Sequence, residues 1–95
     1  MDLNLIEKLK NYLKSAPVNK AWIFGSFSRN EESSESDIDI LVELNRDVKL
    51  GFGFFRMARD LEQISGRNVD LVECGMLDSR VEPFVNRDRI LIYER

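Results

Sequence analysis

Three aspartates stand at or near the starts of apolar runs, where their side chains could meet and bind a cation. Asp37 and Asp39 open the run DIDILVEL, and Asp70 lies in the run VDLV. Alternate residues of a strand point to one face, so the first two carboxylates lie about 6.6 Å apart. At that distance they repel by about 2.5 kcal/mol at an effective dielectric of about 20, and open solvent or a cation must offset this repulsion. If folding brings Asp70 alongside, three oxygen donors without histidine or thiolate suit Mg²⁺ or Mn²⁺, and two such ions would position a triphosphate and an attacking hydroxyl.

A glycine and a serine at the end of another apolar run supply the complementary half of a possible site. A strand that stops at Gly25 and enters a helical turn at Ser26 points free backbone N–H groups at one spot, where a phosphate can bind. The Ser26 hydroxyl can bond a phosphate oxygen, and Arg29, further along the same helical face, could hold the terminal phosphates. Taken alone, Gly25 and Ser26 indicate only a turn that caps a helix, and Asp70 indicates only a carboxylate that faces water at the edge of a strand. The joint pattern, with ten residues between Ser26 and Asp37, would arise by chance in about one chain in a thousand of this length and favours a nucleoside-triphosphate site.

Alternating and helical patterns predict the elements that would position these residues. The expected elements, in order, are a helix from Asp2 that Pro17 ends, a strand at 21–24, a short helix and exposed loop at 27–36, a strand at 37–44, a helix at about 50–65 followed by Gly66, a strand at 69–72, a helix at about 79–87 after the cap Asp78, and a strand at 90–93. This order implies a small α/β (α+β) layer structure, with helices flanking a mixed sheet of about four strands, in one domain spanning residues 1–95.

The helix expected at about 50–65 carries phenylalanines near its start. Its apolar residues form one stripe, which Phe55 and Ala58 widen. We therefore expect Phe52, Phe54 and Phe55 in the core rather than stacked on nucleic-acid bases. No calcium-loop, dinucleotide-loop or Walker pattern is complete in the chain.

The composition limits both the chemistry and the partners. With no histidine and one cysteine, the chain alone cannot build a Ser-His-Asp or Cys-His centre, or a zinc site of histidines or four thiolates. Its net charge of −3 argues against a protein that binds duplex DNA by neutralising phosphates. No apolar run approaches the ~20 residues of a membrane span, and the charged N-terminal segment has no signal-peptide core. We therefore expect a cytoplasmic protein that does not enter a membrane.

Two sequence blocks together resemble the signature of the minimal nucleotidyltransferases (MNT domains) of the DNA polymerase β-like nucleotidyltransferase superfamily. They are WIFGSFSR at 22–29 and SDIDILV at 36–42. The segments VDLVE at 69–73 and ILIYE at 90–94 are similar to the strand that carries the third carboxylate of these domains and to their usual end. The resemblance extends over nearly the whole chain from Ala21 and implies the DNA polymerase β-like nucleotidyltransferase fold.

The resemblance also implies a role for each candidate residue. The ligands of two Mg²⁺ ions would be Asp37, Asp39 and Asp70, and the triphosphate contacts would be Gly25, Ser26 and Arg29. Asp70 would also help to activate the acceptor hydroxyl. The reaction would move AMP from ATP to that hydroxyl and release pyrophosphate. Asn30 departs from the glycine that family members commonly carry there, although asparagine tolerates left-handed backbone geometry.

MNT domains are often the antitoxin half of a pair with HEPN proteins, which are helical ribonuclease toxins, and they modify a HEPN tyrosine with AMP. The resemblance therefore implies a HEPN partner, AMP transfer to its tyrosine and a homo- or hetero-oligomeric assembly. Two alternatives stay open at this point. The chain could be a binding module that neutralises its partner by contact alone, or it could transfer a nucleotide to an RNA 3′ end or a small molecule.

Overall fold

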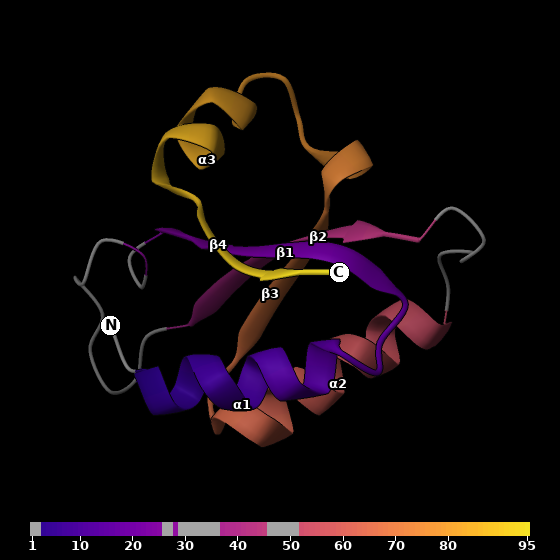
Figure 1. Ribbon diagram of the computed structural model, residues 1–95. Coiled ribbons are helices and arrows are strands. Elements are labelled where there is room, and N and C mark those ends of the chain that lie inside the picture. Colours follow the sequence, from indigo (N-terminus) through magenta and orange to yellow (C-terminus); the bar gives the residue numbers. More distant parts are fainter. Residues whose placement is uncertain (1–2, 26–27, 29–36, 46–51) are drawn as a thin grey trace.

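The fold is a four-stranded sheet with helices on both sides (Figure 1). The computed structural model describes residues 3–25, 28, 37–45 and 52–95. Its elements are α1 (Leu3–Leu13), β1 (Val18–Phe24), β2 (Ile38–Leu44), α2 (Phe52–Ser65), β3 (Val69–Glu73), the 3₁₀ turn η2 (Cys74–Met76), α3 (Glu82–Asp88) and β4 (Ile90–Glu94). The mixed sheet and its flanking helices confirm the predicted α+β class.

Strand order and direction bring the starts of two strands together. The order across the sheet is β3-β2-β1-β4. β1 pairs antiparallel with both β2 and β4, whereas β2 and β3 run parallel. Parallel neighbours need a crossover connection, and α2 provides it between β2 and β3. As a result, β2 and β3 begin at the edge of the sheet where β1 ends.

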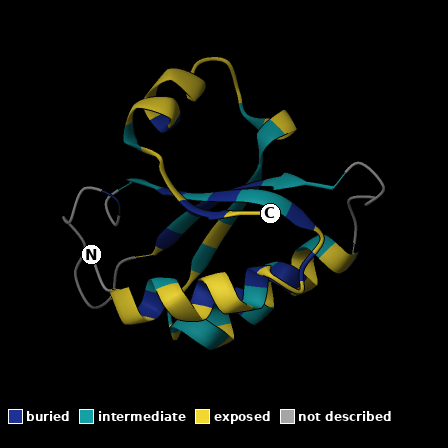
Figure 2. Cartoon of the chain, viewed as in Figure 1, coloured by how far each residue is buried: buried dark blue, intermediate teal, exposed yellow. Residues whose placement is uncertain are grey.

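The core lies between the sheet and the pair of helices α1 and α2, which cover one face (Figures 1 and 2). The side of α1 that faces the sheet carries Leu9 and Leu13, both fully buried. Ile38 and Ile40 of β2 are also fully buried in this core. Since successive strand residues point to opposite faces, Asp39 points away from α1 and α2. The alternation that builds the core therefore also orients this carboxylate.

The apolar stripe of α2 is narrower than predicted. Met57 and Leu61 are buried, and Phe54 packs against the core at its margin. Phe55, which was expected to widen the stripe, is 72% exposed, so that prediction is wrong. Each helical residue is rotated by about 100° from the one before it, which turns the Phe55 ring away from the sheet. Gly66 follows the helix with a left-handed φ of 68°, as predicted.

Several element boundaries differ from the prediction: β1 begins at Val18 rather than at 21, and α3 also begins at a different position. The Asp78 side chain accepts a hydrogen bond from the backbone N–H of Arg80 at 2.8 Å, and its carbonyl accepts two further backbone N–H groups. This turn delays the helix, so α3 begins at Glu82 rather than at 79. Pro83 then falls in the first helical turn, where proline is tolerated.

Some predicted features fall outside the described residues. These are the capping residue Asp2, the start of the second long helix at Leu50, and most of the short helix and loop expected at 27–36. Among the helices that are described, none is long and apolar enough to cross a membrane.

Candidate functional site

Asp39 and Asp70 lie directly opposite each other on neighbouring parallel strands. The β2–β3 register pairs these two residues and, one position earlier, pairs the core residue Ile38 with Val69. Residues paired across adjacent strands point to the same face, and the strands are about 4.8 Å apart. The two carboxylates, which are 31 positions apart in the sequence, therefore lie side by side on the face away from α1 and α2. The structure thus brings together two predicted site residues whose pairing the sequence left open.

Asp37 lies at the same edge of the sheet, directly before β2. It is exposed and stands two positions before Asp39. The next residue, Ile38, donates a backbone hydrogen bond to the Asn68 carbonyl at 2.9 Å, which ties the start of β2 to the start of β3. Within the described residues, however, no three His, Cys, Asp or Glu side chains are grouped closely enough to hold a metal ion. Two of the three predicted ligands are therefore paired, the third lies beside them at the strand start, and metal binding stays a prediction.

Gly25 directly follows β1 and lies against the Asp39 carboxylate. Its φ of 76° is left-handed, a conformation that costs a residue with a side chain about 1–2 kcal/mol. A Cβ atom at this position would collide with Oδ2 of Asp39. The register agrees, since Phe24 pairs with Asp39 across β1 and β2. From the sequence, we expected Gly25 to let a phosphate approach the backbone closely. In the structure, the Asp39 carboxylate also leaves no room for a side chain at this position.

The turn after Gly25 is closed by Ser28, a residue that the sequence analysis missed. Its hydroxyl donates a hydrogen bond to the Gly25 carbonyl at 2.7 Å, and its backbone N–H donates to the same oxygen at 3.2 Å. Ser28 is buried, and a serine three residues after a turn glycine is the signal that could have found it. The predicted triphosphate contacts Ser26 and Arg29 lie outside the described residues.

The single cysteine does not add a thiolate to this side of the sheet. Cys74 is half-buried directly after β3. Burial raises the pKa of its thiol, the negative charges of Glu73 and Glu43 raise it further, and the positive charge of Arg89 opposes them. The thiol is therefore protonated at neutral pH and a poor metal ligand. The candidate donors are carboxylate oxygens, and this chemistry fits Mg²⁺.

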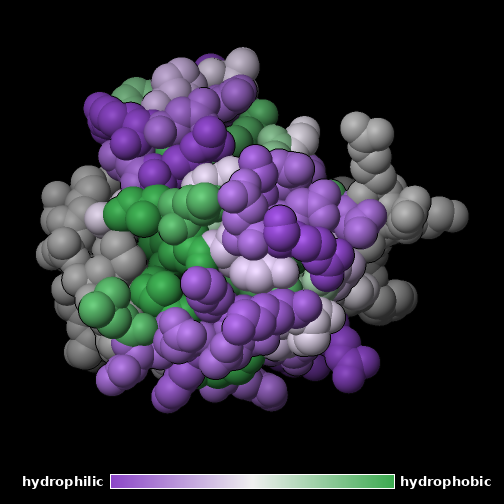
Figure 3. Space-filling model, in the orientation of Figure 1, coloured by the Kyte–Doolittle hydropathy of each residue, from purple (hydrophilic) through white to green (hydrophobic). Residues whose placement is uncertain are grey.

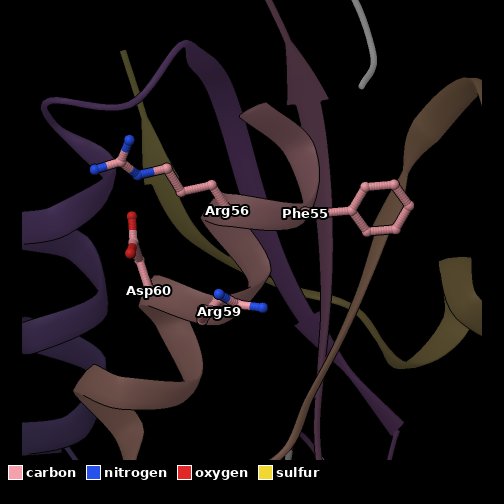
Figure 4. Close-up of a pocket in the computed structure, with 4 residues that line it drawn as sticks. All are labelled: Phe55, Arg56, Arg59 and Asp60. Atoms are coloured by element: carbon pink, nitrogen blue, oxygen red, sulfur yellow. The ribbon is translucent and has the colours of Figure 1, made fainter. Parts of the chain in front are cut away.

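A hollow of about 410 Å³ lies on α2, the helix that covers the opposite face of the sheet (Figure 4). Its lining residues are Phe55, Arg56, Arg59 and Asp60, with Phe55 and Arg56 pointing to opposite sides of the helix. Asp60 accepts a hydrogen bond from the Tyr12 hydroxyl of α1 at 2.8 Å. Burial, and then this bond, raise the pKa of Tyr12 to about 12. The Tyr12–Asp60 bond joins the two helices, and the hollow lies on the helical side of the sheet, away from the paired carboxylates.

Comparison with known proteins identifies the family of the chain. The family model described as “Polymerase beta, Nucleotidyltransferase” matches residues 7–95. The chain belongs to this family. The nucleotidyltransferase is 37% identical over 92 residues to a Methanocaldococcus jannaschii protein named “Putative protein adenylyltransferase MJ0435”, which covers 96% of this chain and 92% of that protein. It is 33% identical over 75 residues to “Protein adenylyltransferase MntA” of Thermococcus cleftensis, with 79% and 75% of the two chains covered.

Solved structures show that the nucleotidyltransferase shares its fold with chains found in toxin–antitoxin complexes. A crystal structure of a toxin–antitoxin with AMP-PNP matches with a TM-score of 0.76 at 23% identity, over 100% of this chain and 75% of that one. A complex of tri-AMPylated Shewanella oneidensis HEPN toxin with MNT antitoxin matches with a TM-score of 0.68 at 19% identity, over 96% and 73%. These likenesses confirm the predicted fold.

Proposed function

We propose that this nucleotidyltransferase moves AMP from ATP to a tyrosine hydroxyl of a HEPN ribonuclease toxin and so acts as its antitoxin. The observation that carries the proposal is the register that sets Asp39 beside Asp70, with Gly25 against Asp39. The relatives named as protein adenylyltransferases support transfer to a protein. The MNT–HEPN complex among the similar folds supports the choice of partner.

The aspartates are proposed to hold two Mg²⁺ ions. Asp37 and Asp39 would share both ions, and Asp70 on the neighbouring strand would complete one of the two sites. Carboxylates from two adjacent strand starts fit an ion that takes one or two protein carboxylates and fills its other positions with phosphate oxygens and water. When bound, the ions supply positive charge that stabilises the attacking and leaving oxygens of an in-line displacement.

The proposed transfer breaks one phosphoanhydride bond and forms one phosphoester bond. The acceptor oxygen bonds to the α-phosphorus, the bond to the oxygen that bridges to the β-phosphorus breaks, and pyrophosphate leaves. Asp70 is exposed at the edge of the sheet, and we assign it the task of orienting the acceptor hydroxyl and helping to remove its proton. Gly25, Ser26 and Arg29 would hold the triphosphate tail, so the protein contributes mainly position and charge.

A protein partner would complete the acceptor side of this single catalytic domain, residues 1–95. Figure 3 shows apolar side chains gathered between the hydrophilic surfaces of α3 and α1. Large exposed apolar residues of these elements and of β4 include Leu3, Phe84 and Leu91, which are 77%, 58% and 47% exposed. Exposed apolar surface of this kind is typical of protein contacts. A HEPN protein docked there would bury it.

The test combines the purified chain, its HEPN partner, Mg²⁺ and ATP labelled at the α-phosphate. The label should move to the HEPN protein, mass spectrometry should place AMP on a tyrosine, and both EDTA and Asp39→Asn should abolish the transfer. Asp78→Asn is the matched control, because Asp78 is a carboxylate outside the site, ion-paired with Arg80 at 2.9 Å. Inhibition of the toxin by Asp39→Asn without any transfer of label would instead show a module that acts by contact alone. Label on RNA or on a small molecule would show that the acceptor is not the HEPN protein.

A further inference from the structure

Arg89 lies on the same face and at the same edge of the sheet as the paired aspartates. Extended by one position, the β1–β4 register places Arg89 beside Phe24, which pairs with Asp39 on β2. The Arg89 side chain lies above β1, with its guanidinium carbon 4.9 Å from the centre of the Trp22 ring. Trp22 stands two positions before Phe24 in β1 and therefore shares its face.

The aromatic ring positions the guanidinium without occupying its hydrogen-bond donors. An arginine over an aromatic face keeps its N–H groups at the edge of the guanidinium plane, where they can reach an anion. Arg89 is exposed, and no carboxylate in the part of the chain that the structure describes forms an ion pair with it. The structure thus presents a positioned cation on a face whose other charged residues include Asp39 and Asp70.

The backbone positions along this edge of the sheet change from acidic to basic residues, and the Arg89 guanidinium lies over Trp22, two residues in from Phe24. From β3 to β4 the edge carries Asp70, Asp39, the turn at Gly25 and then Arg89. Two strand spacings, about 10 Å, separate the backbones of Asp39 and Arg89. A nucleoside triphosphate bound to divalent cations needs carboxylates near the metal and positive charge near the terminal phosphates. The order along this edge, with the two aspartates first and the arginine last, places carboxylates and positive charge in the arrangement that such a nucleotide needs.

We propose that Arg89, held in place by Trp22, binds the β- and γ-phosphates of the nucleotide, which leave as pyrophosphate. This inference rests on the proposed nucleotidyl transfer and adds a binding residue to its site. The planar fork of an arginine can form two parallel, charge-assisted hydrogen bonds to a phosphate. Arg89 would complement the turn at Gly25 from the neighbouring strand.

The experiment measures the affinity of the chain for ATP with Mg²⁺ and for adenosine by isothermal titration calorimetry. Arg89→Ala should weaken ATP binding about 10- to 100-fold, the range expected for hydrogen bonds to a charged group. It should leave adenosine binding within about 2-fold, because adenosine has no phosphate for Arg89 to bind. Arg89→Lys keeps the charge but loses the planar fork, so its ATP affinity should fall between those of the wild type and Arg89→Ala.

Arg87→Ala is a matched control. The Arg87 guanidinium carbon is 5.5 Å from the centre of the Phe84 ring, so this pair is of the same kind but lies on α3. Its loss should leave ATP affinity unchanged. Trp22 is the single tryptophan of the chain, so its fluorescence in the wild type should respond to ATP bound beside Arg89. Thermal unfolding of each variant checks that it is folded at the temperature of the titration.

The results separate the role of Arg89 from the proposed nucleotidyl transfer. If Arg89→Ala binds ATP as tightly as the wild type, Arg89 does not contact the phosphates and the proposal is overturned. The same holds if ATP and adenosine affinities fall equally, since that pattern shows a structural role for the Arg89–Trp22 pair. If the wild type itself binds no ATP, the proposed nucleotidyl transfer fails first.

Discussion

The two faces of the sheet carry different residues and meet different demands. The face under α1 and α2 is apolar, and residues such as Leu9, Ile40 and Leu61 are fully buried there. The other face presents Asp39 beside Asp70 and is covered by α3 and η2 only in part (Figure 1). β2 serves both faces, because its alternate residues point to each in turn. Stability and the proposed chemistry should therefore respond to different substitutions.

We expect the largest effect from a substitution on the face of the sheet that carries Asp39 and Asp70, and we expect it in the rate of AMP transfer. Asp39→Asn should slow AMP transfer at least about 1,000-fold, about 4 kcal/mol of transition-state stabilisation, because it removes a proposed metal ligand. Its free energy of unfolding should stay the same or rise slightly, since like charges opposite each other on neighbouring strands destabilise a sheet. Radiolabel transfer and urea unfolding measure the two quantities. A variant that keeps more than about a tenth of the wild-type rate would contradict this role for Asp39.

The next effect is expected on the helical face. Leu61→Ala should lower the free energy of unfolding by about 3 kcal/mol, because it leaves a cavity where a fully buried side chain packs. The ATP affinity of the folded fraction should not change. Urea unfolding and calorimetric titration at low temperature measure the two quantities. An equal loss of stability and nucleotide affinity would show that the faces are coupled.

Gly25→Ala should affect both properties, because Gly25 lies where β1 meets the carboxylate of Asp39. A left-handed alanine and the collision of its Cβ with that carboxylate should cost about 2 kcal/mol of stability and also slow transfer. Gly53→Ala is the control, since a Cβ at Gly53 of α2 meets no atom within 4 Å. This second variant should lose no stability and should keep its transfer rate, because Gly53 lies in the first turn of α2 with open space around it. Unchanged transfer in a folded Gly25→Ala protein would remove this turn from the site.

The smallest effect is expected at the contact between the two helices. Tyr12→Phe removes the hydroxyl bonded to Asp60 and should cost about 1 kcal/mol of stability without changing transfer. The pKa of Tyr12 in the folded protein is about 12, above its ordinary value of 10.0. Its contribution to stability is therefore fully present below pH 10 and is lost as the pH rises through 12. Urea unfolding at pH 9 and pH 11 should show a larger loss in the wild type than in Tyr12→Phe, and equal losses would contradict this assignment.

Much of the fold could be predicted because local periodicity reflects burial. Alternation in β2 correctly placed Ile38 and Ile40 in the core and Asp39 on the other face. Gly66 correctly marked the end of α2. Phe55 was wrongly assigned to the core, because a phenylalanine on the margin of a helical stripe carries no signal that says how wide the opposing surface is.

The candidate site could be predicted only in part, because its geometry depends on pairing between distant segments. The sequence identified Asp39 and Asp70 as candidates, but their register follows from the crossover through α2. Arg89, which we propose as a phosphate-binding residue, was missed because its aromatic neighbour, Trp22, lies far away in the sequence and on another strand. Ser28 was missed although its spacing from Gly25 is a local pattern.

The central claim is that divalent cations and a nucleotide bind at the edge of the sheet where Asp39 and Asp70 are paired. Nuclear magnetic resonance with Mn²⁺ in place of Mg²⁺ tests it most directly, because the paramagnetic ion broadens the amide signals nearest to it. With ATP present, trace Mn²⁺ should broaden the signals of residues 37–40 and 69–71 first, leave the exposed side of α1 sharp, and have no such effect on Asp39→Asn. Broadening centred on α2, or the same pattern in Asp39→Asn, would contradict the account.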